Sequence, residues 1–203
     1  MMVLMRHVSR WRAWPVLVMA FLAGCSDSGQ EGAVETSPPA GYAAYEAEMA
    51  GLQATWGGVA VTDPATLPLS GSARYDGVLR LDSETAAGNV LLDGALQLDV
   101  AFASDSLSGS AGNFVSQAEV PYDGILTIAN GVIDRLADTS TSYTILADLS
   151  GALTGGGETL NYAITLNGDF LGLQAGAVIG VLQGQVVHAA GSGLVLGDFL
   201  AAQ

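Results

Sequence analysis

The fold is decided by the segment VLLDGALQLDVAF (90–102), in which apolar and polar residues alternate. One face collects Val90, Leu92, Leu96, Leu98, Val100 and Phe102, and the other collects Asp93, Gln97 and Asp99. A period of two is that of an extended strand with one buried face, whereas a helix repeats its apolar residues every three or four positions. The segment is therefore predicted to be an antiparallel strand that packs one face on a core.

The same alternation recurs on both sides of this segment. In residues 143–154, Tyr143 and Ile145 are expected to face inward and Thr144 outward. Turn signals give eight strands, at about 72–82, 89–103, 106–116, 122–129, 142–153, 158–170, 176–188 and 193–201. Short connections favour sequential hairpins, and eight such strands tend to close. The predicted fold is all-β, an eight-stranded antiparallel up-and-down β-barrel, with an open two-sheet sandwich as the alternative.

Glycines recur inside the predicted strands, in YDGVL, LDGAL, LSGSA, YDGIL, LSGAL and LNGDF. They favour tight coiling of the sheet, or mark bulges, and both lead to a barrel. The inward residues are large aliphatics and tyrosines, so a spacious ligand cavity is not implied. A barrel that spans the outer membrane would alternate too, with an apolar lipid-facing side and a polar lumen. The polar face carries Asp93, Asp99, Asp148 and Asp169, and the alternation alone does not decide whether it points in or out. A chain with a lipid anchor and a tether has no need to span, so the spanning barrel is the less favoured alternative.

A short amphipathic helix is predicted before the barrel. Between residues 41 and 54 the apolar residues Tyr42, Tyr45, Met49 and Leu52 follow one another at spacings of three and four. Glycines and prolines then make a linker over roughly 57–70. Within the barrel, residues 130–141 (NGVIDRLADTST) form the main predicted loop. The domains are thus a helix and linker at 41–70 and a β-barrel at 71–203.

The amino terminus carries an export signal. Residues 1–12 contain three arginines and no acidic residue, and residues 13–21 (AWPVLVMAF) are apolar. The apolar stretch has the length of the apolar region of a signal peptide. The following LAGC (22–25) matches the lipobox of bacterial lipoproteins and contains the only cysteine, Cys25. We expect a signal peptide at 1–24, acylation of Cys25 with palmitate-type chains, and a flexible tether in 25–40. Ser26 favours lipid-anchored delivery to the outer membrane, at its cell-surface or its periplasmic face.

Charge limits the partners of the mature chain. After Cys25 there remain three arginines against all 20 acidic residues, a formal net charge of −17. Such a surface repels phosphate backbones and anionic headgroups. The sequence therefore predicts no nucleic-acid partner and membrane attachment through the lipid anchor alone.

Motifs for catalysis are missing from the sequence. His188 is the only histidine after Cys25, and neither HExxH, CxxC nor GxSxG occurs. The glycine run 155–157 joins two predicted strands and lacks a following lysine, so it is a turn and not a phosphate loop. The acidic segment DRLAD (134–138) lacks the spacing of a calcium loop. We predict a non-enzymatic protein with no cofactor and no metal site.

Three segments carry a resemblance to a known family: TDPATLPLSGSARYDGVL (62–79), LQLDVAFASDSLSGSAGNF (96–114) and LNGDFLG (166–172). They resemble the β-barrel domain of transferrin-binding protein B and related surface lipoproteins, over about residues 67–203. The resemblance implies an eight-stranded barrel on a lipid tether that binds host proteins or iron or haem carriers. Some members of the family reach the cell surface through a dedicated surface-lipoprotein translocator. The family's second lobe and handle domain have no counterpart here, and none of its ligand residues maps onto this chain.

Two functions follow as hypotheses. The first is an outer-membrane-anchored lipoprotein that binds a protein or a carried solute, such as an iron or haem carrier. The alternative is a structural envelope lipoprotein that acts as a spacer or assembly partner. Exposed aromatic loops would favour binding, and Tyr122, Trp56 and the 130–141 loop are the candidates.

Overall fold

The computed structural model describes residues 41–203; the predicted signal peptide, Cys25 and the tether lie outside the described residues. One helix, α1 (Tyr42–Trp56), and a 3₁₀ turn, η1 (Pro64–Thr66), precede eight strands. The strands are β1 (Ser72–Thr85), β2 (Gly88–Ala101), β3 (Ser106–Ser116), β4 (Pro121–Ile133), β5 (Ile145–Gly155), β6 (Glu158–Leu171), β7 (Ala177–His188) and β8 (Gly191–Ala202). In this part of the chain, neither helix has the length and apolarity needed to cross a bilayer.

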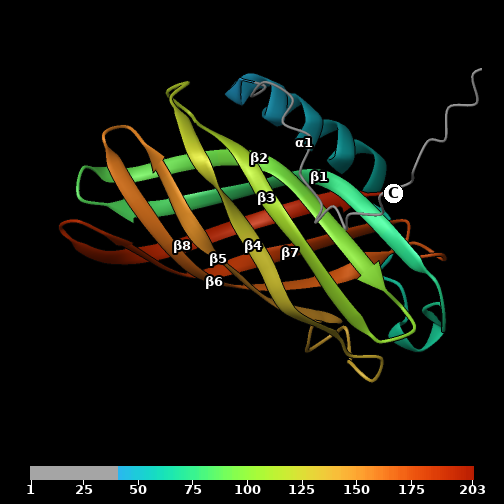
Figure 1. Cartoon of the computed structure of the whole chain (residues 1–203). Helices are drawn as coiled ribbons and strands as arrows, with labels where there is room; N and C mark the ends of the chain where they lie inside the picture. The colour runs from blue at the N-terminus through green and yellow to red at the C-terminus, as the bar shows by residue number, and fades with distance from the viewer. Residues whose placement is uncertain (1–40) are drawn as a thin grey trace, which may run out of the picture. The chain divides into compact units, whose positions relative to one another are not determined.

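The strands form a closed up-and-down barrel (Figure 1). Each strand pairs antiparallel with its successor, and β8 pairs with β1 through partners such as Gly77 and Ala201. The prediction of an eight-stranded antiparallel barrel is confirmed, and the β1–β8 pairing excludes the open sandwich. Closure leaves no unpaired sheet edge among these eight strands.

The interior of the barrel is filled by the apolar face of each strand. The largest side chains with less than 2% exposure are Tyr75, Leu79, Leu81, Leu92, Leu98, Phe114, Leu126, Ile128, Ile145, Leu149, Phe170 and Phe199. The ring of Phe170 packs between those of Tyr75 and Phe102, with centroids 6.0 and 5.8 Å away. An eight-stranded barrel is just wide enough for such a core.

A glycine pair makes room for one aromatic ring in this core. Gly168 on β6 lies opposite Gly180 on β7, which in turn pairs with Phe199 on β8. A Cβ on Gly168 would stand 2.9 Å from Cζ of Phe199, and one on Gly180 would meet the same ring. The glycines within these strands therefore provide space for a ring inside a tightly coiled sheet.

Helix α1 lies along the outer wall of the barrel, against β1, β2 and β8 (Figure 1). Three of the four residues of the predicted apolar stripe, Tyr42, Tyr45 and Met49, are buried, and the fourth, Leu52, is partly buried. They cover an apolar patch on the outside of the barrel, made of Val78, Val115, Leu171, Ala177 and Leu200. The described part of the chain therefore has two apolar clusters, one inside the barrel and one beneath α1.

The two ends of the barrel differ. At the hairpin end lie the four short turns 86–87, 117–120, 156–157 and 189–190; at the linker end lie residues 57–71, 102–105, 134–144 and 172–176. Helix α1 starts at the hairpin end, where Tyr42 N donates to Glu119 Oε2 at 3.1 Å. It finishes at the linker end, where Trp56 packs against Gly172 and Gly176.

Three predicted strand boundaries are off by three or four residues: β1 ends at Thr85 and not at 82, β4 ends at Ile133 and not at 129, and β5 starts late. β5 begins at Ile145 and not at 142, and Tyr143 is 46% exposed while Thr144 is 1% exposed, the reverse of the expected alternation. The backbone N–H and Oγ1 of Thr144 both donate to Asp169 Oδ1 at 2.9 Å. A buried side-chain contact therefore orients this segment, and the loop runs over 134–144 and not over 130–141.

Candidate functional site

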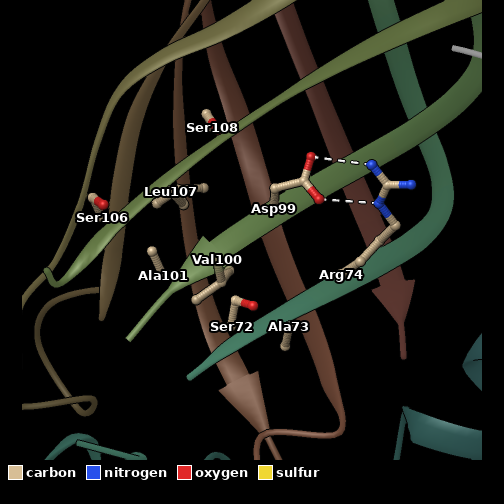
Figure 2. A pocket seen from close by; sticks show the side chains of 9 residues that line it. All are labelled: Ser72, Ala73, Arg74, Asp99, Val100, Ala101, Ser106, Leu107 and Ser108. Carbon is tan, nitrogen blue, oxygen red and sulfur yellow. Dashed lines mark hydrogen bonds and ion pairs between the residues drawn. The ribbon is translucent and has the colours of Figure 1, made fainter. Parts of the chain in front are cut away.

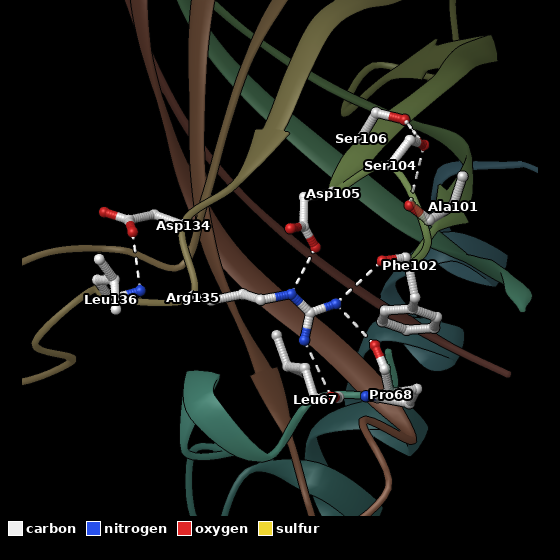
Figure 3. Close-up of polar contacts among 10 residues, drawn as sticks. All are labelled: Leu67, Pro68, Ala101, Phe102, Ser104, Asp105, Ser106, Asp134, Arg135 and Leu136. Carbon is white, nitrogen blue, oxygen red and sulfur yellow. Dashed lines mark hydrogen bonds and ion pairs between the residues drawn. The ribbon is translucent and has the colours of Figure 1, made fainter. Parts of the chain in front are cut away.

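Arg135 ties the linker end together (Figure 3). Its Nε donates to Asp105 Oδ1 at 2.6 Å, and its two terminal nitrogens donate to the carbonyls of Leu67 at 2.9 Å, Pro68 at 2.7 Å and Phe102 at 3.0 Å. The rigid five-donor fork of an arginine suits this set of partners. One side chain thus fixes the linker, the β2–β3 turn and the β4–β5 loop relative to one another.

Three leucines stand out from this end of the barrel. Leu69 is 81% exposed, Leu136 is 93% exposed and Leu173 is 99% exposed. Leu69 and Leu136 directly follow Pro68 and Arg135, which are hydrogen-bonded to each other. Apolar tips on loops that a rigid scaffold positions are characteristic of interaction surfaces.

Leu173 is positioned by the linker. Thr62 Oγ1 donates to the carbonyl of Gly172 at 2.5 Å, and Gly172 N donates to the carbonyl of Ala60 at 3.0 Å. An isolated bridge between Val61 and Leu171 extends this contact. The β6–β7 turn that carries Leu173 is therefore held by backbone and side-chain hydrogen bonds on its linker side.

Two hollows lie at the same end. One, of about 450 Å³, is lined by Thr66, Pro68, Ser70, Gly71, Ser72, Ala73, Phe102, Leu173, Gln174 and Gln203. The other, of about 400 Å³, shares Ser72 and Ala73 with it and continues along β1, β2 and β3. Figure 2 shows the second hollow, with the ion pair of Arg74 and Asp99 (3.0 Å) beside the three serines of its lining. We call the three leucines and these two hollows the linker-end surface.

The aromatic residues suggested by the sequence do not form this surface. Tyr122 is 5% exposed and belongs to the interior core. Trp56, the last residue of α1, is partly buried and packs against the β6–β7 turn. The expectation of an exposed ring was wrong for Tyr122, which the barrel interior encloses, whereas Trp56 keeps part of its surface exposed. From the 130–141 loop, Leu136 is on the surface, and the neighbouring Tyr143 is half-exposed.

Sequence reasoning missed Leu69 and Leu173. Both stand in turn-rich segments, LPLSG (67–71) and GLQAG (172–176), where no apolar periodicity explains them. A large apolar residue between glycine, proline and serine is the signal that could have identified them.

The strand pattern suggested that Asp93 lies on a solvated face, and the structure shows that it does not. Its side chain is 0% exposed, and both carboxylate oxygens accept hydrogen bonds from Arg80. Those bonds raise the pKa of Arg80, which also pairs with Glu46 of α1. The outward face of β1 and β2 is therefore buried here, because α1 covers it.

His188 lies at the hairpin end, away from the linker-end surface. It lines a hollow of about 520 Å³ together with Glu158 and Asn161, and its Nδ1 is buried without a hydrogen-bond partner in the described residues. A catalytic histidine is normally oriented by a carboxylate at this atom. Within residues 41–203, no group of three His, Cys, Asp or Glu side chains is arranged to hold a metal ion. Cys25, the predicted lipidation site, lies outside the described residues.

Comparison with known proteins finds similarity to several solved structures. Two of them are a double and a single mutant of the vaccine antigen transferrin-binding protein B from Haemophilus parasuis Hp5, each 19% identical over 70% of this chain, with TM-scores of 0.48 and 0.47. The similar region spans 28% and 29% of those chains. No family model matches this sequence, and no curated protein does.

Proposed function

We propose that this chain is a lipid-anchored, non-enzymatic lipoprotein of the outer membrane that binds a protein partner through the linker-end surface. The observation that carries the proposal is the near-complete exposure of Leu69, Leu136 and Leu173 on segments that Arg135 and Thr62 hold in place. Apolar side chains on a preorganised surface lose little conformational freedom when they bind, so they contribute efficiently to affinity.

The filled interior favours a protein over a carried solute. The barrel core contains tyrosines, phenylalanines and leucines with almost no exposure. A small solute would need a concave site that buries most of its surface. The two hollows of the linker-end surface lie on the outside and suit side chains of a partner.

The predicted tether joins the described chain at the hairpin end of the barrel. The predicted tether, residues 26–40, contains 15 residues and reaches at most about 50 Å from Cys25. It enters the described chain at Gly41, beside Glu119 at the hairpin end. The linker-end surface therefore lies at the end of the barrel opposite to the point where the predicted tether joins the described chain.

The anchor is tested by Cys25→Ser. The variant is expected to lose metabolic labelling with an alkyne fatty acid, with an unchanged circular dichroism spectrum of the purified chain. A Ser26→Ala variant is the matched control and keeps its label. Labelling that persists in Cys25→Ser contradicts the anchor.

The binding surface is tested by photo-crosslinking on intact cells. A photoreactive residue at Leu136 or Leu173 is expected to give a discrete crosslinked species, and one at Leu194, which is 57% exposed on the wall of β8, is expected to give none. Equal crosslinking from all three positions, or none from the linker end, would contradict a binding role for that end. Protease accessibility of the same cells separates display at the cell surface from the periplasmic face.

A further inference from the structure

Charge at the linker end points to the chemistry of the partner. Residues 41–203 contain 17 acidic side chains and three arginines. Each arginine is already in an ion pair: Arg74 with Asp99, Arg80 with Asp93 and Glu46, and Arg135 with Asp105. The described surface therefore offers a partner no free basic side chain, and 13 of the 17 carboxylates have no ion-pair partner there.

Three of these carboxylates flank the exposed leucines. Asp134 and Asp138 stand two residues on either side of Leu136, and Asp63 follows Thr62, which holds the turn of Leu173. Asp134 accepts from Leu136 N at 2.9 Å, and Asp63 accepts from Ala65 N at 3.0 Å. Hydrogen bonds from Ser140 keep the pKa of Asp138 below its ordinary value. All three carboxylates are exposed, and local hydrogen bonds fix their positions.

We infer that the partner, on the proposed function above, is a basic protein surface with an apolar centre: its apolar side chains meet the three leucines and its lysines or arginines meet Asp63, Asp134 and Asp138. A second copy of this chain is a poor occupant, because two strongly acidic surfaces repel each other. An anionic lipid surface is excluded as the favoured occupant for the same reason.

The test uses a defined probe and two variants with equal charge changes. The chain from Cys25 to Gln203, with Cys25→Ser, is titrated with an 18-residue amphipathic helical peptide of leucine and lysine, or of leucine and glutamate. One triple variant carries Asp63→Asn, Asp134→Asn and Asp138→Asn at the linker end. The other carries Asp82→Asn, Asp123→Asn and Glu158→Gln at the hairpin end, so that net charge is matched.

The lysine peptide is expected to bind, with amide shifts in NMR spectra confined to 60–71, 102–105, 134–144 and 172–176, and the glutamate peptide is not. The linker-end triple should weaken binding about tenfold and the hairpin-end triple less than about threefold. Equal weakening by both triples, no binding of the lysine peptide, or equal binding to phosphatidylcholine vesicles overturns the inference about the partner's charge.

A third variant separates this inference from the proposed function. Leu69→Ser, Leu136→Ser and Leu173→Ser together should abolish peptide binding, while Leu194→Ser with Leu196→Ser, both 57% exposed on β8, should not. If the leucine triple has no effect, the linker-end surface itself fails. If the leucines matter and the position of the carboxylates does not, only the basic partner is wrong.

Discussion

Arg80 on β1 and Asp93 on β2 lie directly opposite each other in the sheet and share two hydrogen bonds, Nε to Oδ1 at 2.8 Å and Nη2 to Oδ2 at 2.7 Å. Helix α1 closes over the pair: Glu46 binds the same guanidinium, and the ring of Tyr42 lies 5.9 Å from its Cζ. The ion pair therefore joins the barrel wall to α1, the helix that precedes the barrel in the chain.

Asp93→Asn should lower the free energy of unfolding by about 2 kcal/mol, because it leaves a partly buried guanidinium without its main counter-charge. Urea denaturation measures the loss. Asp99→Asn is the matched control, since Asp99 pairs with Arg74 across the same two strands with side chains 49% and 54% exposed. That pair is exposed to solvent, so its loss should change the free energy of unfolding far less. Similar losses in both variants would show that burial beneath α1 does not strengthen the pair.

Arg135→Lys should loosen the linker end without unfolding the barrel. An ammonium cannot reach the three carbonyls and the carboxylate that the guanidinium joins. Hydrogen exchange is expected to accelerate at 66–70 and 134–144 and to stay unchanged at the hairpin-end turns. Arg74→Lys, at an exposed ion pair, serves as the control. Uniform acceleration over the whole barrel would mean that Arg135 stabilises the fold globally and not this end alone.

Gly180→Ala should destabilise the barrel by about 2 kcal/mol, because the new methyl group meets the ring of Phe199 and the carbonyl of Asn167. Gly51→Ala, in the exposed interior of α1 with nothing within 4 Å, should stabilise by up to about 1 kcal/mol through helix propensity. Thermal and urea unfolding of the two variants should thus shift in opposite directions. A neutral Gly180→Ala would remove the space argument for the glycines of the strands.

Two buried tyrosines predict how stability depends on alkaline pH. Burial raises the pKa of Tyr75 and of Tyr162 to about 12, from an ordinary value of 10.0. Because the folded state favours the neutral phenol, the stabilisation is complete below pH 10 and is lost as the pH rises towards 12. Tyr75→Phe with Tyr162→Phe should flatten the fall in unfolding free energy between pH 9 and 11.5, as followed by urea denaturation.

The control for this pH experiment is Tyr143→Phe, whose side chain is 46% exposed. It should leave the alkaline fall unchanged. The hydroxyls removed by the double variant contact Ala175 O at 2.7 Å and Ser83 Oγ at 3.1 Å, so some loss at neutral pH is expected as well. An alkaline fall as steep in the double variant as in the parent would show that other groups control it.

Local pattern was sufficient for the barrel. Successive side chains of a strand point to opposite faces of the sheet. The period of two in 90–102 and its repeats therefore predict which residues fill the core, including Leu92, Leu98 and Phe170. The short connections predict the hairpin order for the same reason, since two-residue turns join only antiparallel neighbours. The helix stripe of Tyr42, Tyr45 and Met49 likewise follows from spacing alone.

Where the pattern failed, a distant segment covers or redirects a residue. Asp93 looks solvated in its strand, but α1, from another part of the chain, excludes water from it. Thr144 and Tyr143 exchange faces because Asp169, 25 residues later, binds Thr144. Such contacts leave no trace in the period of a single strand.

The sequence by itself determined the type of fold, the core residues and the acidic charge, because each depends on residue type and on the geometry of one segment. It also predicts acylation at Cys25 from a motif of adjacent residues. Only the tertiary structure decided that Leu69, Leu136 and Leu173 are exposed at one end of the barrel and that Arg135 holds the first two of their segments together. Their segments are far apart in the chain and are brought together by barrel closure and by the hydrogen bonds of Arg135, which depend on three-dimensional position and not on local order.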